Sequence, residues 1–185
     1  MSNFNTVNEV TRWRAFTVGD AVYDLSHLDA HWAEYQDTRD PVKVTTYRFI
    51  VTYGLHCFTK ALPGMSDDDE QRLMYIAPRE SRPFNFERYE LSKQLPAIIR
   101  SLGSQETLVA HAGYGKYAIV KVVTADGREV DYLVPFMVFK ERKKLRLHVQ
   151  SAYPLDQQPG RVQKVNFFLI ARRLQRNEQL PRPFK

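Results

Sequence analysis

The sequence has a single cysteine and no long apolar run, and these two absences exclude several classes of protein. Cys57 has no second cysteine in the chain with which to form a disulfide, which excludes a disulfide-stabilised secreted scaffold. The longest apolar stretches, 132–139 and 165–171, are far shorter than the roughly 20 residues of a membrane-spanning helix. The first residues lack the charged start and the apolar segment of a secretory signal. We therefore expect a cytoplasmic protein with no membrane partner.

The sequence does have ample material for a hydrophobic core. Hydrophobic residues make up 43% of the 185 residues and aromatic residues 12%, which argues against global disorder. This length fits one compact domain and is short for two. We expect a single domain over residues 1–185. Residues 85–154 would form a core of helix and antiparallel sheet, with residues 1–84 as a β-rich extension packed on it.

The first 84 residues favour strands and loops. Residues 14–28 alternate around a Gly-Asp turn, which predicts a strand or a small hairpin. Residues 29–41 are polar and rich in turn formers, so we expect a loop with at most one helical turn. The β-branched and aromatic residues of 42–60 predict a strand. Residues 63–85 predict a connecting loop with a short helix after Ser66.

The clearest helical pattern covers residues 85–104. Asn85 is a favourable N-cap, and Gly103 is a favourable residue for ending a helix. Pro96 lies inside the pattern, so it must either kink the helix or begin a second segment. We expect one apolar face of this helix to pack on a sheet.

After Thr107 the sequence predicts one strand after another. The expected strands are 107–112, 116–124, 130–140, 144–153 and 164–174, with a hairpin turn at 125–129. The last of these segments also obeys helical spacing, so it is either a strand or a helix. The expected fold class is α+β, with one main helix packed on a mainly antiparallel sheet.

The strand predicted at 144–153 has two unlike faces. The apolar face includes Leu145, Leu147 and Val149, and the polar face includes Lys144, Arg146, His148 and Gln150. Arg146 and His148 would project side by side, about 7 Å apart along the strand. A cation next to a group that titrates near neutral pH suits RNA cleavage without a metal, since it can stabilise a charged phosphate and transfer a proton. The alternative is an ordinary solvated strand face.

The charge of the chain is strongly asymmetric. The net charge is +6, and residues 140–185 contain 12 Lys or Arg against three acidic residues. A basic segment of this kind favours binding of RNA or another polyanion, or of an acidic protein. The candidate nucleic-acid-binding residues are Lys116, Lys140, Arg142, Lys143 and Lys144. The alternative is that these charges serve solubility.

Other histidines give weaker signals. His27 and His31 have the spacing of two metal ligands on a helix, but the glutamate of a metalloprotease motif is missing. His56 and Cys57 are adjacent, so on a strand they would point to opposite faces, and we expect Cys57 to be a buried apolar group. The glycine-rich turn at 111–117 carries His111, Tyr114, Lys116 and Tyr117, and lacks the spacing of a phosphate loop. We expect no metal and no cofactor.

A helix is followed by a strand with a histidine, a glycine-rich turn, antiparallel strands and the segment "HVQSAY". This order resembles the barnase/EndoU/RelE-type ribonuclease toxin domains over residues 85–154. The resemblance implies that His111 is the early histidine, Arg146 the sheet cation, and Ser151 with Tyr153 the late hydroxyl and aromatic. Ser151 and Tyr153 share the parity of the apolar face, so they join His148 in one site only if a bulge or strand end switches the face near Gln150.

The segments "VYDLSHLDAHWAEY", "HCFTK" and "RLHVQSAY" also resemble those of small bacterial proteins, which implies a bacterial or phage-related origin and no particular chemistry. The first hypothesis is a toxin-like or defence-related protein that binds RNA on a basic sheet and cleaves it without a metal. His111 or His148 would be the general acid or base, and Arg146 would stabilise the phosphate. The alternatives are a non-enzymatic module that binds nucleic acid or protein, and a small-ligand-binding domain lined by Tyr and Phe.

Overall fold

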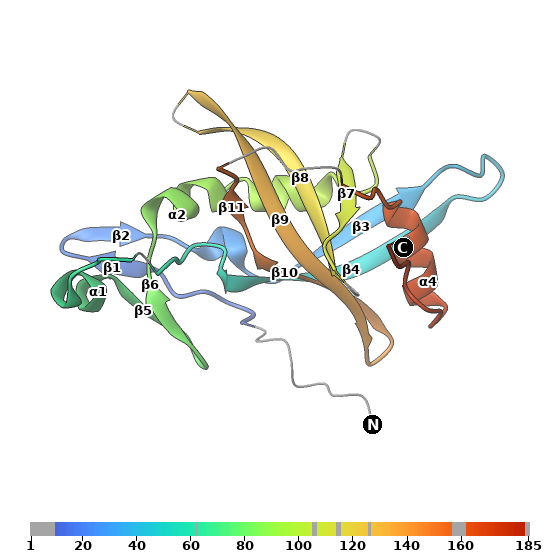
Figure 1. Cartoon of the computed structure of the whole chain (residues 1–185). Coiled ribbons are helices and arrows are strands. Elements are labelled where there is room, and N and C mark those ends of the chain that lie inside the picture. Colours follow the sequence, from blue (N-terminus) through green and yellow to red (C-terminus); the bar gives the residue numbers. More distant parts are fainter. Residues whose placement is uncertain are drawn as a thin grey trace.

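A computed structural model describes residues 10–61, 63–104, 107–113, 116–125, 127–156 and 162–183. Within these residues, a seven-stranded sheet forms the centre of the fold (Figure 1). Its strands lie in the order β3 (His31–Asp37), β4 (Thr45–His56), β10 (Lys144–Ser151), β9 (Arg128–Glu141), β8 (Lys116–Ala125) and β7 (Leu108–His111), and β11 (Tyr153–Pro154) pairs with β9. Neighbouring strands are antiparallel except β4 and β10, which are parallel. The predicted α+β class is confirmed.

Smaller elements surround the sheet. Two hairpins, β1 (Phe16–Val18) with β2 (Ala21–Tyr23) and β5 (Met74–Ile76) with β6 (Ser81–Pro83), lie beyond one end of it (Figure 1). The helical elements are η1 (Ser26–Leu28), α1 (Asp67–Leu73), α2 (Phe86–Ser92), α3 (Leu95–Arg100) and α4 (Phe167–Gln175). None of these helices has the length and hydropathy needed to cross a membrane.

The two faces of the sheet have different surroundings. One face, which we call the covered face, carries Phe49, Leu147 and Val149 and is fully buried at these positions. Helices pack on it: Tyr35 of β3 donates a hydrogen bond of 2.9 Å to the carbonyl of Ile99 in α3, and rings of β3 and β4 contact those of α4. The opposite face, which we call the pocket face, carries the polar residues of β10.

Local sequence signals placed several elements correctly. The Asn85 side chain accepts a hydrogen bond from the amide of Arg88, so it caps α2 as predicted. Pro96 lies in the first turn of α3, so it begins a second helix and does not kink a single one. Ser66 caps α1 in the same way. The predicted hairpin turn joins β8 and β9, although its Asp126 lies outside the described residues.

Three segments differ from their prediction or were left open by it. Residues 63–85 contain the predicted short helix, α1, but the rest was predicted to be a connecting loop and also forms the β5–β6 hairpin. Residues 29–41 were predicted to be a loop, and this is wrong, because they contain β3. Its alternation was hidden because the outward row begins with the exposed Trp32, while the inward row has the polar residues His31 and Asp37 at its ends and only Ala33 and Tyr35 buried. The segment 164–174, left open between strand and helix, forms α4, and its buried residues follow the helical spacing.

Candidate functional site

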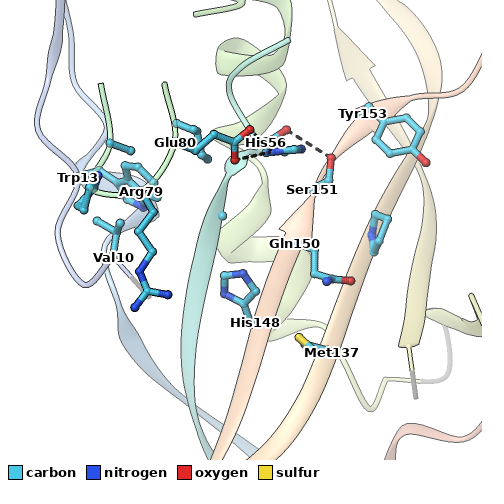
Figure 2. A pocket seen from close by; sticks show the side chains of 15 residues that line it. Val10, Trp13, His56, Arg79, Glu80, Met137, His148, Gln150, Ser151 and Tyr153 are labelled. Carbon is cyan, nitrogen blue, oxygen red and sulfur yellow. Dashed lines mark hydrogen bonds and ion pairs between the residues drawn. The ribbon is translucent and has the colours of Figure 1, made fainter. Parts of the chain in front are cut away.

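A hollow of about 680 Å³, which we call the pocket, opens on the pocket face of the sheet. Its walls come from β4, β9 and β10, from the turn of the β5–β6 hairpin, and from the N-terminal segment (Figure 2). The lining residues are Val10, Trp13, Gly54, Leu55, His56, Ala77, Pro78, Arg79, Glu80, Pro135, Met137, His148, Gln150, Ser151 and Tyr153. Segments far apart in the sequence therefore meet at one cavity.

The pairing of β4 with β10 is irregular at the point where residues of both faces of β10 line the pocket. Val149 pairs with Tyr53, but Ser151 pairs with His56, so β4 holds one extra residue at this point. Such a bulge bends the strand that carries the extra residue and re-aims its side chains, and Leu55 and His56 of β4 both line the pocket next to Gly54. β10 ends at Ser151, and at this strand end His148 and Gln150 of the polar row and Ser151 of the apolar row line the same pocket. The sequence analysis required a bulge or a strand end near Gln150 for His148 and Ser151 to share a site, and the structure has both there.

Gly54 allows the two strands to approach at this bulge. A Cβ atom at Gly54 would lie 2.8 Å from the carbonyl oxygen of Gln150 and 3.3 Å from that of Val149. Both contacts are with backbone atoms of the neighbouring strand, which cannot rotate away as a side chain can. The glycine is therefore required by close approach of the backbone.

His148 is the buried imidazole of the pocket, with 6% of its surface exposed. Its Nδ1 forms a 3.0 Å hydrogen bond with Oγ1 of Thr52, which is also buried. Burial, assisted by the charge of Arg146, lowers the pKa of His148 to about 4. The ring is therefore neutral at neutral pH. Its Nε2 has no hydrogen-bond partner among the described residues, so it can donate to or accept from a bound molecule.

The opposite wall carries the charges of the pocket. Glu80 accepts a hydrogen bond of 3.1 Å from Nε2 of His56 and one of 3.3 Å from Arg82. Arg79, the residue before it, reaches along the side of the pocket that faces His148 and Gln150 (Figure 2). Among the described residues, Arg79 has no hydrogen-bond or ion-pair partner.

Two of the predicted catalytic residues lie elsewhere. Arg146 shares the pocket face with His148, but it does not line the pocket, and its guanidinium donates a 2.8 Å hydrogen bond to Glu141. His111 belongs to the covered face, because residues paired across neighbouring strands point to the same face of a sheet. His111 pairs with Tyr117, Tyr117 pairs with Phe136, and Phe136 pairs with Val149 of the covered face. Three strand spacings, about 14 Å along the sheet, separate His111 from the strand of His148. The structure does not bring the two histidines together.

The predicted nucleic-acid-binding cations divide into two groups. Lys140 donates hydrogen bonds to the carbonyl of Gln175 and the side chain of Asn177, so it holds the end of α4. The other cations are exposed. Arg142 and Lys143 form the β9–β10 turn with positive φ angles, Lys144 follows them, and Lys116 lies next to Met137 on the pocket face.

His27, His31 and Cys57, the other sequence candidates among the described residues, lie outside the pocket. His27 lies in η1, where its Nε2 is 2.8 Å from Oγ of the buried Ser92, and His31 lies in β3, so they do not share a helical face. The described residues hold no cluster of three or more His, Cys, Asp or Glu side chains that could bind a metal ion. Cys57 is fully buried, as predicted, and burial raises the pKa of its thiol to about 12. Tyr114 and Gly115 of the predicted glycine-rich turn lie outside the described residues.

Sequence reasoning missed the pocket residues from the first half of the chain, including Trp13, His56 and Arg79. One signal was available. Gly54 interrupts a run of β-branched and aromatic residues, and a glycine within a strand often marks a bulge or a close approach of the backbone.

The chain has relatives among known proteins. The profile of the YjaZ family matches residues 15–175. Protein YjaZ of Escherichia coli (strain K12) is 48% identical over 180 residues, which cover 96% of this chain and 98% of that protein. No solved structure matches the chain. The predicted likeness to small bacterial proteins is confirmed by this relative. The family match spans most of the chain, from β1 to the end of α4, and the chain therefore belongs to the YjaZ family.

Proposed function

We propose that this protein binds a small organic ligand in the pocket. The observation that carries the proposal is that the bulge at Gly54 meets the end of β10, where His148, Gln150 and Ser151 line one cavity of about 680 Å³. Cavities of this size are typical of sites for small molecules and cofactors. A built irregularity that gathers polar groups in a partly apolar hollow is a common feature of binding sites.

The composition of the wall suits recognition of a mixed ligand. Trp13, Leu55 and Met137 offer apolar surface, while Gln150 and the Nε2 of His148 offer hydrogen bonds. Because His148 is neutral and buried, it suits orientation of a ligand better than binding of a phosphate by charge. This arrangement supports the small-ligand alternative raised by the sequence over cleavage in the pocket.

A fluorescent probe tests this proposal. Trp13 and Trp32 are the two tryptophans of the chain, and only Trp13 lines the pocket. In a Trp32→Phe variant, excitation of Trp13 should produce energy transfer to the uncharged dye N-phenyl-1-naphthylamine, with saturable one-to-one binding. Adding Ser151→Phe should fill the pocket and weaken binding at least about tenfold, since the added ring competes for the same space.

The matched control is Ser81→Phe, the same substitution at an exposed serine outside the pocket lining. It should leave the affinity for the dye unchanged. If the dye shows no saturable binding, or if Ser151→Phe binds it as well as the parent protein, the pocket is not a ligand site.

RNA binding with metal-independent cleavage is our second proposal. Arg146 and His148 lie on one face of β10, as predicted, and the exposed Trp32 lies on the same face. The guanidinium of Arg48 is 4.6 Å and the ammonium of Lys144 is 6.0 Å from the Trp32 ring centre. An exposed aromatic ring among cations suits stacking of a base in single-stranded RNA. In a cytoplasmic toxin-like or defence-related setting, His148 would have to act without His111.

Labelled RNA in EDTA tests this second proposal, with the Arg146→Ala/His148→Ala double variant alongside wild type. Cleavage by wild type alone would support a ribonuclease related in mechanism to the barnase/EndoU/RelE-type domains. Salt-sensitive binding without cleavage would support the non-enzymatic module, with RNA, another polyanion or an acidic protein as its partner. Intact, unbound RNA at low salt would count against RNA as the partner.

A further inference from the structure

We propose that the ligand of the pocket carries an anionic group, a carboxylate, sulfonate or phosphate, that binds Arg79. This inference rests on the proposed ligand-binding function and specifies the chemical class of the ligand. It comes from the charged residues that line the pocket and from the hydrogen-bond and ion-pair partners that each of them has or lacks.

The backbone of Arg79 is held in a closed turn at the edge of the pocket, and its side chain is exposed. It lies in the turn of the β5–β6 hairpin, which a 3.1 Å hydrogen bond from the amide of Ala77 to the carbonyl of Glu80 closes. Pro78 restricts the backbone φ angle just before it. The side chain runs along the wall opposite β10 (Figure 2). A guanidinium presented by a short, closed turn is well placed to meet a group entering the pocket.

The negative charge of the lining is already engaged. Glu80 is the acidic residue of the lining, and it is bonded to His56 and to Arg82, which comes from outside the pocket. The carboxylate is therefore shared between two groups that compete with Arg79 for it. Arg79 itself has no partner among the described residues. The lining thus presents a cation without a protein counter-ion.

The remaining polar groups suit the same ligand. The side-chain amide of Gln150 and the Nε2 of His148 have no hydrogen-bond partners among the described residues. Both residues line the wall that faces Arg79. The side-chain N–H of Gln150 can donate a hydrogen bond to an anion, and so can His148 in the tautomer that carries its proton on Nε2. A guanidinium binds planar oxyanions through two parallel bonds. Trp13 and Met137 would contact the rest of the molecule. The expected ligand is a small amphipathic anion with an aromatic or aliphatic body.

Two dyes that differ in one charged group test the inference. 8-Anilinonaphthalene-1-sulfonate has the same rings as N-phenyl-1-naphthylamine with an added sulfonate. In the full-length chain, Arg79→Gln should weaken binding of the sulfonate dye about tenfold, the typical effect of losing a charge-assisted hydrogen bond. The same variant should change the affinity for the uncharged dye less than about twofold, since that dye has no anionic group for Arg79 to bind. Arg79→Lys should retain part of the affinity for the sulfonate.

Arg128→Gln is the matched control, because Arg128 is exposed at the start of β9 and does not line the pocket. It should change neither affinity. If Arg79→Gln leaves binding of the sulfonate dye unchanged while the uncharged dye still binds, the anion inference is overturned and the proposed ligand-binding function stands. If neither dye binds saturably to the wild-type protein, the proposed function fails and the inference fails with it.

Discussion

A Gly54→Ala variant should lose about 2 to 3 kcal/mol of unfolding free energy, measured by urea denaturation, because overpacking at a rigid contact is strongly destabilising. The added Cβ would meet the carbonyl oxygen of Gln150 at 2.8 Å. That oxygen belongs to the backbone of β10, so relief requires β10 to move away from β4. The same movement would separate the walls of the pocket, and we expect the variant to bind N-phenyl-1-naphthylamine more weakly than wild type.

The control for this variant is Thr46→Ala, an exposed position on the same strand. It shortens a side chain without approaching β10, and a surface change of this kind should alter stability by no more than about 0.5 kcal/mol. If Gly54→Ala and Thr46→Ala have equal, small effects on the urea midpoint, the close approach of the two strands does not exist in solution.

Acidification should destabilise the protein through His148. In the unfolded chain its pKa returns to the ordinary 6.5, whereas in the folded protein burial holds the pKa at about 4. Between these two values the unfolded chain binds more protons, so the free energy of unfolding falls as the pH falls. The contribution of His148 is complete above about pH 6.5 and is lost progressively down to about pH 4. Its full size is about 3 kcal/mol.

Urea denaturation at several pH values between 4 and 7 measures this effect. A His148→Gln variant should show a much shallower dependence on pH, because its amide keeps a hydrogen-bonding group near Thr52 and does not titrate. His27, whose pKa burial also lowers, should leave a smaller dependence of the same sign. Thr46→Ala, an exposed position without a titrating side chain, serves as the control and should keep the wild-type dependence on pH. Identical curves for wild type and His148→Gln would refute the buried, neutral state of this ring.

Local signals in the sequence were enough to predict most elements of the fold. Caps such as Asn85 and Ser66 act within one turn of a helix, and the apolar alternation of β10 is visible in eight residues. The parallel pairing of β4 with β10 could not be predicted in this way, because an apolar pattern shows that a strand is buried and not which strand lies next to it. The same limit hid the role of the first 84 residues, which supply two strands of the central sheet.

The sequence was enough to predict only part of the candidate site. The pattern of residues 144–153 indicates His148 and Ser151, with the condition that a bulge or a strand end must bring them to one side. Arg79 was not selected, because nothing within its own segment indicates that the β5–β6 hairpin lies across the sheet. His111 was grouped with His148 by sequence order alone, and strand pairing places them on opposite faces.

The pairing of β4 with β10 also sets an order of events during synthesis. The β3–β4 hairpin can form as soon as its residues leave the ribosome, but the edge of β4 stays unpaired until β10 is made, because Thr52 and His148 are 96 residues apart. Exposed apolar strand edges are sites of misassociation in nascent chains. Since β4 and β10 together form the floor of the pocket, this cavity comes into existence only in the last stage of folding, when the C-terminal third of the chain closes onto the N-terminal third.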